Sequence, residues 1–261
     1  MRKTALITGA SAGFGVEFAR LFAHRRNDVI LTARRADRLT ELAASLQAEH
    51  GINAHVIVAD LAAHDGARGL FDAVQKRGLE VEYLVNNAGF GTFGPFVETD
   101  AAESMDLVRV NIAALTELTA LFLPAMVERG SGRVLNVASA AAFQPGPLMA
   151  TYYASKAYGL HFSEALNEEL EGTGVSVTAL CPGAVMTEFQ QVAGMETSGL
   201  VVNKRLISVE DVVEAGYDAM MRGKPFVVPG LGPKLLSFGV RFMPRRFIAK
   251  FVHRMQAERT P

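Results

Sequence analysis

The sequence has almost no cysteine, since Cys181 is the single one among 261 residues. One thiol excludes an intrachain disulfide framework and a zinc centre built on cysteines. It also favours a reducing compartment, and we expect a cytoplasmic protein without a metal site. The chain has no basic neighbour next to Cys181, so this thiol is expected to be a buried small hydrophobe rather than a nucleophile.

Net charge and long apolar runs are missing as well. The 26 Lys and Arg residues balance 27 Asp and Glu residues, which gives a net charge of −1 and no general attraction to nucleic acid. No apolar run reaches the roughly 18 residues that indicate a membrane-spanning helix. The near-zero average hides a basic end, however, because Lys234 to Pro261 carries seven basic residues and one acidic residue, Glu258.

Short apolar runs alternate with longer segments of helical periodicity. Their near-continuous apolarity indicates strands that are covered on both faces, and the alternation predicts βαβ units. No repeat or Pro/Gly-rich linker divides the chain, and its length suits one domain over residues 1–261. We therefore predict an α/β fold of Rossmann type, a doubly wound parallel sheet with helices on both faces. Its seven expected strands are Thr4–Thr8, Val29–Ala33, His55–Ala59, Tyr83–Asn86, Arg133–Ala138, Ser176–Leu180 and Phe226–Val228.

A glycine-rich turn follows the first expected strand. Glycines allow a sharp turn and a close approach to a pyrophosphate, and the helix that begins near Phe14 directs its positive end at the anion. The spacing Gly-x3-Gly-x-Gly differs from that of long-chain dehydrogenases, and the turn lacks the lysine of a P-loop. The expected contacts with a nucleotide come from Gly9, Ser11, Gly13, Phe14 and Gly15.

The second expected strand ends in two arginines, Arg34 and Arg35, where many dinucleotide-binding folds carry an acid. Guanidinium groups here suit the 2′-phosphate of NADP(H), so this cofactor is preferred over NAD(H). The alternative is that both arginines are solvent-exposed residues at the start of the next helix. Asp60, followed by Leu61, is placed to bind the adenine amino group or, alternatively, to cap a helix over 61–77.

A tyrosine and a lysine, Tyr152 and Lys156, are spaced to share one face of a helix. Reducing a carbonyl needs a proton donor, and a phenol serves if positive charge brings its pKa down by about three units from its ordinary value near 10. Ser139, at the end of the fifth strand, is expected to stabilise the developing charge on the substrate oxygen. The adjacent Tyr153 is a competing candidate, and a Tyr/Lys pair at helical spacing is also common on ordinary helix surfaces.

These residues together resemble the short-chain dehydrogenase/reductases. The resemblance extends over residues 4 to about 190 and rests on the glycine-rich turn, Asn86-Asn87-Ala88-Gly89, Asn111, Ser139, Tyr152-x3-Lys156 and Pro182-Gly183 with Thr187. It selects Tyr152 over Tyr153 as general acid/base, assigns Lys156 also to the nicotinamide ribose and gives Asn111 a place in a proton relay. Further cofactor contacts implied by the resemblance are Asn87, Ala88, Gly89, Pro182, Gly183, Val185 and Thr187.

The expected function is therefore an NADP(H)-dependent oxidoreductase that interconverts a carbonyl and a secondary alcohol. The alternative is a non-catalytic NADP(H)-sensing module. Apolar loops after the strands favour an apolar small-molecule substrate. These loops contain Phe90, Phe93, Phe96, Phe143, Leu148, Met149, Met186, Phe189 and Met195. By resemblance, a homodimer or homotetramer would form through helices at 101–127 and 152–172.

The basic end departs from the family pattern. We divide the chain into a cofactor and catalytic core at 1–190, a substrate loop and last strand at 191–230, and an amphipathic basic extension at 231–261. Pro244 splits this extension into two amphipathic segments. It could pack against the acidic body or a neighbouring subunit, cover the substrate, or lie on an anionic membrane surface.

Overall fold

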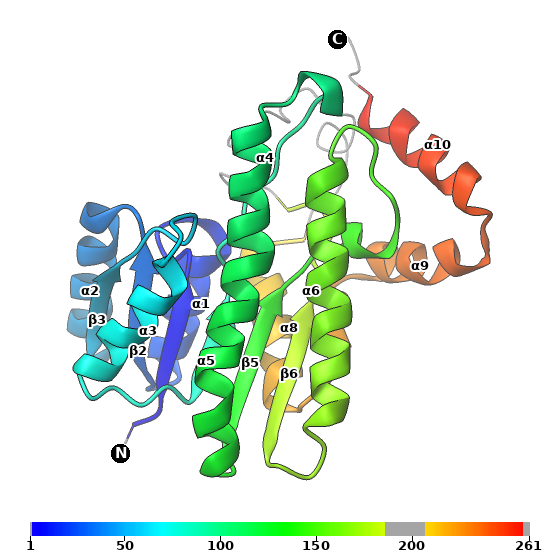
Figure 1. Ribbon diagram of the computed structural model, residues 1–261. Helices are drawn as coiled ribbons and strands as arrows, with labels where there is room; N and C mark the ends of the chain where they lie inside the picture. The colour runs from blue at the N-terminus through cyan, green and yellow to red at the C-terminus, as the bar shows by residue number, and fades with distance from the viewer. Residues whose placement is uncertain (1, 186–206, 258–261) are drawn as a thin grey trace.

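The computed structural model describes residues 2–185 and 207–257. Its centre is a seven-stranded sheet in the order β3-β2-β1-β4-β5-β6-β7, and all neighbouring strands pair in parallel (Figure 1). The strands are β1 (Thr4–Thr8), β2 (Asp28–Ala33), β3 (Ala54–Val58), β4 (Tyr83–Asn86), β5 (Gly132–Val137), β6 (Val175–Leu180) and β7 (Phe226–Val227). The predicted doubly wound sheet is confirmed, with each predicted strand boundary within one residue of the observed one.

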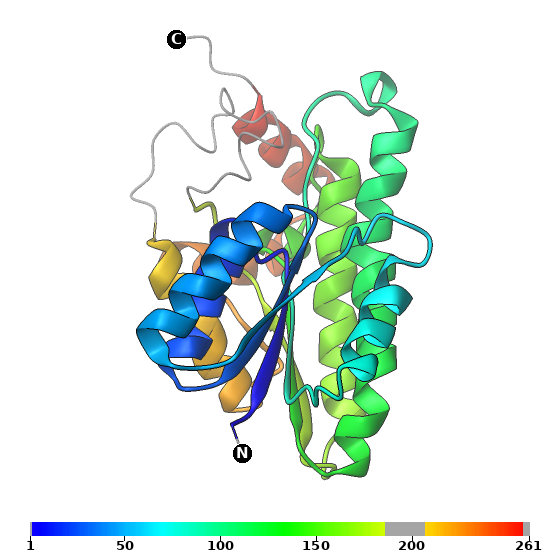
Figure 2. The ribbon, with the colours of Figure 1, turned by 90° about the vertical axis from the view of Figure 1, so that its left-hand side faces the viewer.

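Helices cover both faces of the sheet, as Figure 2 shows from the side. One layer contains α1 (Gly13–His24), α2 (Ala36–His50) and α8 (Val209–Met221), and the other contains α3 (Gly66–Lys76), α4 (Ala101–Val108), α5 (Leu115–Glu128) and α6 (Ala150–Glu169). Phe18, Phe22 and Leu39 pack in the first layer, whereas Leu70 and Phe122 pack in the second. Two separate apolar cores explain why the strands read as continuously apolar.

The third helix begins later than predicted, at Gly66 instead of residue 61. Residues 60–66 form turns instead, with Ala63 N donating to Asp60 O and Gly66 N donating to Ala63 O. A side chain at Gly66 would collide with Asp60 O, at 2.1 Å from its Cβ. The backbone at Asp60 and Gly66 approaches closely in this turn, so the helix begins at Gly66 and not at residue 61.

The segments α4 and α5 are joined without a break by a π-helical turn, η2 (Arg109–Ala114). Within the residues that the structure describes, the resulting helix, Ala101–Glu128, is the one element long and apolar enough to cross a membrane by length and composition. Its buried side chains Leu118, Phe122 and Met126 pack in the core beneath the sheet. We interpret it as a core helix.

The C-terminal extension forms two helices that project beside α6, α9 (Leu231–Gly239) and α10 (Arg245–Gln256), with the short turn η4 (Val240–Phe242) between them (Figure 1). Pro244 directly precedes α10, so the predicted division at this proline is confirmed. The inner side chains Val240, Ile248 and Val252 form a small core. They pack with Ala141 of η3 (Ala140–Phe143), Met149 and Tyr153.

Candidate active site

The glycine-rich turn joins β1 to α1 and has a backbone that only glycine adopts easily. Gly9 has φ +67° and Gly13 has φ +52°, and a Cβ at Gly9 would lie 2.9 Å from both Asn87 Nδ2 and Ala88 Cα. A Cβ at Gly15 would lie 2.2 Å from Gly9 O, so Gly15 allows α1 to pack against the turn. The glycines therefore permit the turn's backbone conformation and its close packing against Asn87, Ala88 and α1.

Asn87 and Thr8 brace this turn against the end of β4. The Asn87 side-chain amide donates to Thr8 O at 2.8 Å, and Thr8 Oγ1 accepts the backbone N–H groups of Asn87 and Ala88 at 2.9 Å each. Sequence reasoning gave Thr8 no role of its own, although its place between strand and glycine was a usable signal. The two residues fix the relative position of two neighbouring strand ends.

The two arginines after β2 differ in their surroundings. The Arg35 guanidinium donates to Ser11 Oγ at 3.0 Å and to Ser11 O at 3.3 Å, which ties it to the glycine-rich turn. Arg34 is exposed and lines the same cavity as Ser11. Asp60 and Leu61 also line it, and Asp60 Oδ1 accepts a hydrogen bond from Ala62 N at 3.0 Å. Asp60 thus caps a turn, while the helix that it was alternatively expected to cap starts at Gly66.

Ser139, Tyr152 and Lys156 meet at the carboxyl end of β5. Ser139 follows that strand, while Tyr152 and Lys156 lie one turn apart on α6. The Tyr152 and Ser139 hydroxyls are hydrogen-bonded. Lys156 Nζ donates to Val137 O at 2.8 Å and lies 5.7 Å from the centre of the Tyr152 ring. The three side chains can therefore act on one bound oxygen.

The pKa of Tyr152 shifts in the direction opposite to the expected one. Burial raises its pKa to about 12, although the hydrogen bond from Ser139 acts to lower it. Part of the ring stays accessible because it faces the cavity, while protein surrounds its other sides. Burial also lowers the pKa of Lys156 to about 8. Desolvation by the protein outweighs the hydrogen bond with Ser139, and Tyr152 is a neutral phenol at pH 7.

Asn111 lies behind the cavity in the π-helical turn. Its side-chain amide donates to Phe90 O and to Ser155 Oγ, each at 3.0 Å, and its Oδ1 accepts from Phe90 N at 3.1 Å. A Cβ at Gly89 would lie 3.0 Å from Asn111 Oδ1 and 3.3 Å from Lys156 Nζ. Asn111 therefore clamps the loop after β4 against α6, next to the lysine.

Tyr153, the competing candidate, points to the C-terminal extension. Gln256 Nε2 of α10 donates to the Tyr153 hydroxyl at 2.6 Å, and Gln256 is fully buried. Sequence reasoning missed this contact, because nothing in the pattern connects residues 103 positions apart. Tyr152 and Tyr153 therefore present their hydroxyls to different partners.

Cys181 is fully buried at the end of β6, and burial raises the pKa of its thiol to about 12. The expected burial of this thiol is confirmed. Among the described residues, no group of three or more His, Cys, Asp or Glu side chains is placed to hold a metal ion.

One cavity of about 1400 Å³ brings most of the predicted site residues together. Of these, Gly15 and Asn111 are not part of its lining and support it from behind, and Thr187 lies outside the described residues. The predicted residues that line the cavity are Gly9, Ser11, Gly13, Phe14, Arg34, Arg35, Asp60, Leu61, Asn87, Ala88, Gly89, Ser139, Tyr152, Lys156, Pro182, Gly183 and Val185.

The substrate end of the cavity differs in part from the expectation. Phe90 and Met149 line it as expected, Phe93 and Phe143 pack behind it, and Phe96 is exposed. Met186, Phe189 and Met195 lie outside the described residues. The extension, for which covering the substrate was one alternative, adds lining residues, which are Leu231, Gly232, Pro233, Leu236 and Met255. Three acids on and before α4 also line the cavity, Asp100, Glu103 and Asp106.

Comparison with known proteins agrees with this geometry. The model of the family "short chain dehydrogenase" matches residues 3–197. Ketoacyl reductase HetN of Nostoc sp. is 35% identical over 77% of this chain and 71% of its own length. A very-long-chain 3-oxoacyl-CoA reductase of Anas platyrhynchos is 33% identical over 72% of this chain, but the match spans only 62% of that enzyme.

A solved structure gives the same result. A short-chain dehydrogenase from Sphingobium yanoikuyae in complex with NADPH superposes with a TM-score of 0.83, at 33% identity and 92% coverage of both chains. Sequence and fold therefore agree over the region that contains the cavity. The chain belongs to the short-chain dehydrogenase family, a family of oxidoreductases that act on CH–OH and C=O groups with a nicotinamide cofactor.

Proposed function

We propose that this protein is an NADP(H)-dependent reductase that converts an apolar carbonyl compound to a secondary alcohol. The observation that carries the proposal is the single cavity in which Ser139, Tyr152 and Lys156 share walls with the glycine-rich turn and Arg34. A proton donor and a nucleotide cradle in one space are what carbonyl reduction needs.

The residues present fit a dinucleotide. Gly9, Ser11 and Gly13 of the glycine-rich turn line the cavity, and the positive end of α1 suits a pyrophosphate. We assign Arg34 to the 2′-phosphate of NADP(H) and Asp60 to the adenine amino group, because both residues line the cavity beside the glycine-rich turn. The bound cofactor supplies a hydride. Asn87 would contact the adenosine ribose, and Lys156 with the loop from Pro182 to Val185 would hold the nicotinamide half.

The chain's own residues then provide the proton. Ser139 donates a hydrogen bond to the substrate oxygen, and the neutral Tyr152 phenol transfers its proton to that oxygen as the C–H bond forms. Lys156, with a pKa of about 8, is largely protonated at pH 7 and stabilises the phenolate that is left. Because burial raises the pKa of Tyr152 to about 12, its phenol is a weak acid, and proton transfer depends on stabilisation of the phenolate by the positive charge of Lys156.

The lining favours an uncharged, apolar substrate. Phe90, Met149, Leu236 and Met255 provide apolar surface, while the carboxylates on α4 disfavour substrates that carry their own carboxylate or phosphate near the rim. The relatives named as ketoacyl and very-long-chain 3-oxoacyl-CoA reductases support reduction of a carbonyl.

The test compares two neighbouring tyrosines. Tyr152→Phe removes the proposed proton donor, and we expect reduction of apolar ketones with NADPH to fall about 10²–10⁴-fold. Tyr153→Phe is the matched control, because its hydroxyl contacts Gln256, and its rate should stay near that of the wild type. Equal rates for wild type and Tyr152→Phe would overturn the mechanism. Tight NADPH binding without turnover by the wild type would favour the sensing module.

Assembly and location are also proposals. The outer face of α5 has a shallow apolar hollow lined by Ala120, Leu123, Pro124, Val127 and Glu128, which supports a homodimer or homotetramer through α5 and α6. Light scattering of the purified protein would measure the number of subunits. The cytoplasmic location stays a prediction from the single cysteine.

A further inference from the structure

The outer face of the C-terminal extension is apolar and exposed. Leu231, Leu235, Phe238 and Phe242 recur at helical spacing, so their side chains form one stripe along α9 and η4. They are 81%, 71%, 59% and 75% exposed, and the Phe238 and Phe242 rings pack edge to face with centroids 5.3 Å apart. We call these four residues the α9 stripe. Isolated exposed apolar residues are ordinary, but a continuous stripe indicates a binding surface.

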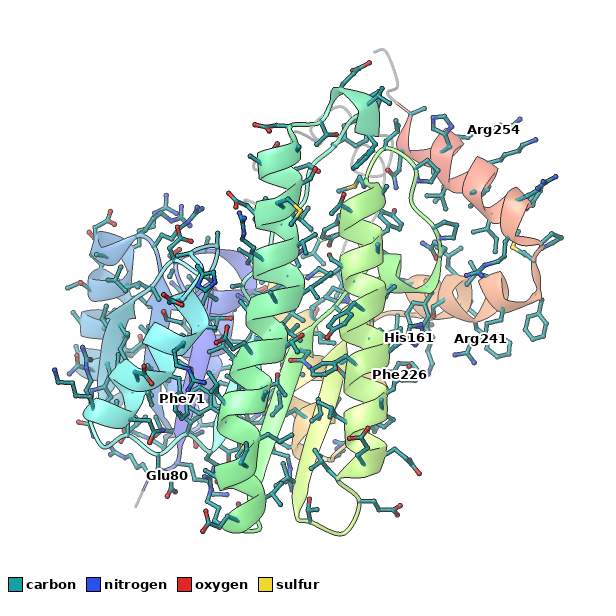
Figure 3. All side chains as sticks on the ribbon, in the orientation of Figure 1. Phe71, Glu80, His161, Phe226, Arg241 and Arg254 are labelled. Atoms are coloured by element: carbon teal, nitrogen blue, oxygen red, sulfur yellow. The ribbon has the colours of Figure 1, made fainter. Side chains whose placement is uncertain are left out.

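The same extension is strongly basic. Residues 231–257 contain six basic side chains, all exposed, and no acidic one. None of the six forms an ion pair with another residue in the described part of the chain. They are Lys234, Arg241, Arg245, Arg246, Lys250 and Arg254. Figure 3 places Arg241 and Arg254 on the side of the molecule away from α3.

The opposite face of the extension already packs against the rest of the protein. Val240, Ile248 and Val252 point inward to Met149 and Tyr153, whereas Phe247 and Phe251 of α10 stay exposed beside Lys250 and Arg254. Packing against the rest of the protein therefore does not cover the α9 stripe. A symmetric contact of the α9 stripe with a second copy would bring Lys234 and Arg241, on the same two elements as the stripe, near the same positive charges of that copy, which is unfavourable.

We propose that residues 231–257 dock the protein on an anionic lipid bilayer, with the α9 stripe among the acyl chains and the basic side chains at the headgroups. Exposed Leu and Phe next to Lys and Arg is the pattern of an interfacial helix. Leu231 belongs both to the stripe and to the cavity lining, so the cavity opens at the lipid surface. Docking itself does not rest on the proposed reaction.

The experiment is co-sedimentation of the full-length protein with two kinds of vesicle. One is pure phosphatidylcholine, and the other contains roughly one-third phosphatidylglycerol, which gives it a negative surface. We expect sedimentation with the anionic vesicles only, and release at high salt because screening weakens the attraction. Equal binding to both kinds of vesicle, or binding to neither, would overturn the proposal.

Two pairs of variants separate the charge from the apolar stripe. Lys250→Glu with Arg254→Glu should lower the partition coefficient at least about thirtyfold, equivalent to about 2 kcal/mol. The control is Lys76→Glu with Arg68→Glu on α3, which makes the same charge change at exposed positions and should have little effect. Phe238→Ser with Phe242→Ser should lower the partition coefficient at least about tenfold. Its control, Val58→Ser with Met221→Ser, removes exposed apolar side chains elsewhere.

Folding and self-association are checked on the same samples. All four variants are expected to keep wild-type NADPH binding and turnover of a water-soluble ketone, because none of the changed residues lines the cavity. Loss of vesicle binding by the controls as well would contradict the proposal. If Phe238→Ser with Phe242→Ser changed the number of subunits in light scattering without changing vesicle binding, the stripe would be a protein interface instead.

Discussion

Individual side chains in this site are set by their nearest neighbours. Tyr152 and Tyr153 are adjacent in sequence, yet one hydroxyl meets Ser139 and the other meets Gln256. Successive residues on a helix point about 100° apart, so only one of the two can face the end of β5. The adjacent Arg34 and Arg35 both line the cavity, but only the Arg35 guanidinium has a hydrogen bond that ties it to Ser11.

The single substitution Arg34→Ala tests the selectivity for NADPH over NADH. Losing a charge-assisted hydrogen bond to the 2′-phosphate should weaken NADPH binding roughly ten- to a hundredfold and leave NADH binding unchanged. Arg35→Ala, which loosens the Ser11 contact, should weaken both cofactors to a similar extent. Dissociation constants from cofactor fluorescence give the comparison. An unchanged NADPH constant in Arg34→Ala would show that the 2′-phosphate assignment is wrong.

Among the elements, the turn between β1 and α1 is the most constrained. Gly9 combines a positive φ with contacts to Asn87 and Ala88, which leave no room for a methyl group. The π-helical turn is a second specialised element, because it places Asn111 where its amide reaches both Phe90 and Ser155. Such local departures from regular helix are common at functional sites.

Gly9→Ala should therefore destabilise the protein by about 1–3 kcal/mol and weaken NADPH binding, since both the backbone strain and the collision act against the native turn. Gly69→Ala is the matched control. Gly69 lies within α3 with no neighbouring atom within 4 Å of its Cβ position, so alanine there should stabilise the protein by up to about 1 kcal/mol. Urea unfolding measures the change in the free energy of unfolding for both variants. A neutral Gly9→Ala would contradict the close approach seen here.

On the scale of the whole molecule, the extension closes the site from a distant part of the chain. A Cβ at Gly183 would lie 2.7 Å from Pro233 Cγ, so the start of the extension packs on the loop after β6. Its end reaches α6 through Gln256 and Tyr153. The Gln256 carbonyl oxygen is buried with no hydrogen-bond partner among the described residues, so this contact satisfies only part of the amide.

A double-mutant cycle measures this long-range coupling. Gln256→Met should cost about 1–3 kcal/mol, because the Tyr153 hydroxyl is left buried without a partner. Combining it with Tyr153→Phe should cost less than the sum, with a coupling of about 1 kcal/mol. Tyr158→Phe, on the same helix but bonded to Thr116, should instead be additive with Gln256→Met. Additivity in both pairs would show that the extension is not held through Gln256.

The sequence by itself determined the sheet, the glycine-rich turn and many of the residues that line the cavity. These depend on local periodicity and on motifs such as Tyr152 and Lys156, whose spacing already implies proximity. Only the tertiary structure decided the pKa of Tyr152, because desolvation depends on every element packed around it. It alone also showed that Gln256 meets Tyr153 and that the α9 stripe faces outward, since residues far apart in sequence are brought together by packing that leaves no local pattern.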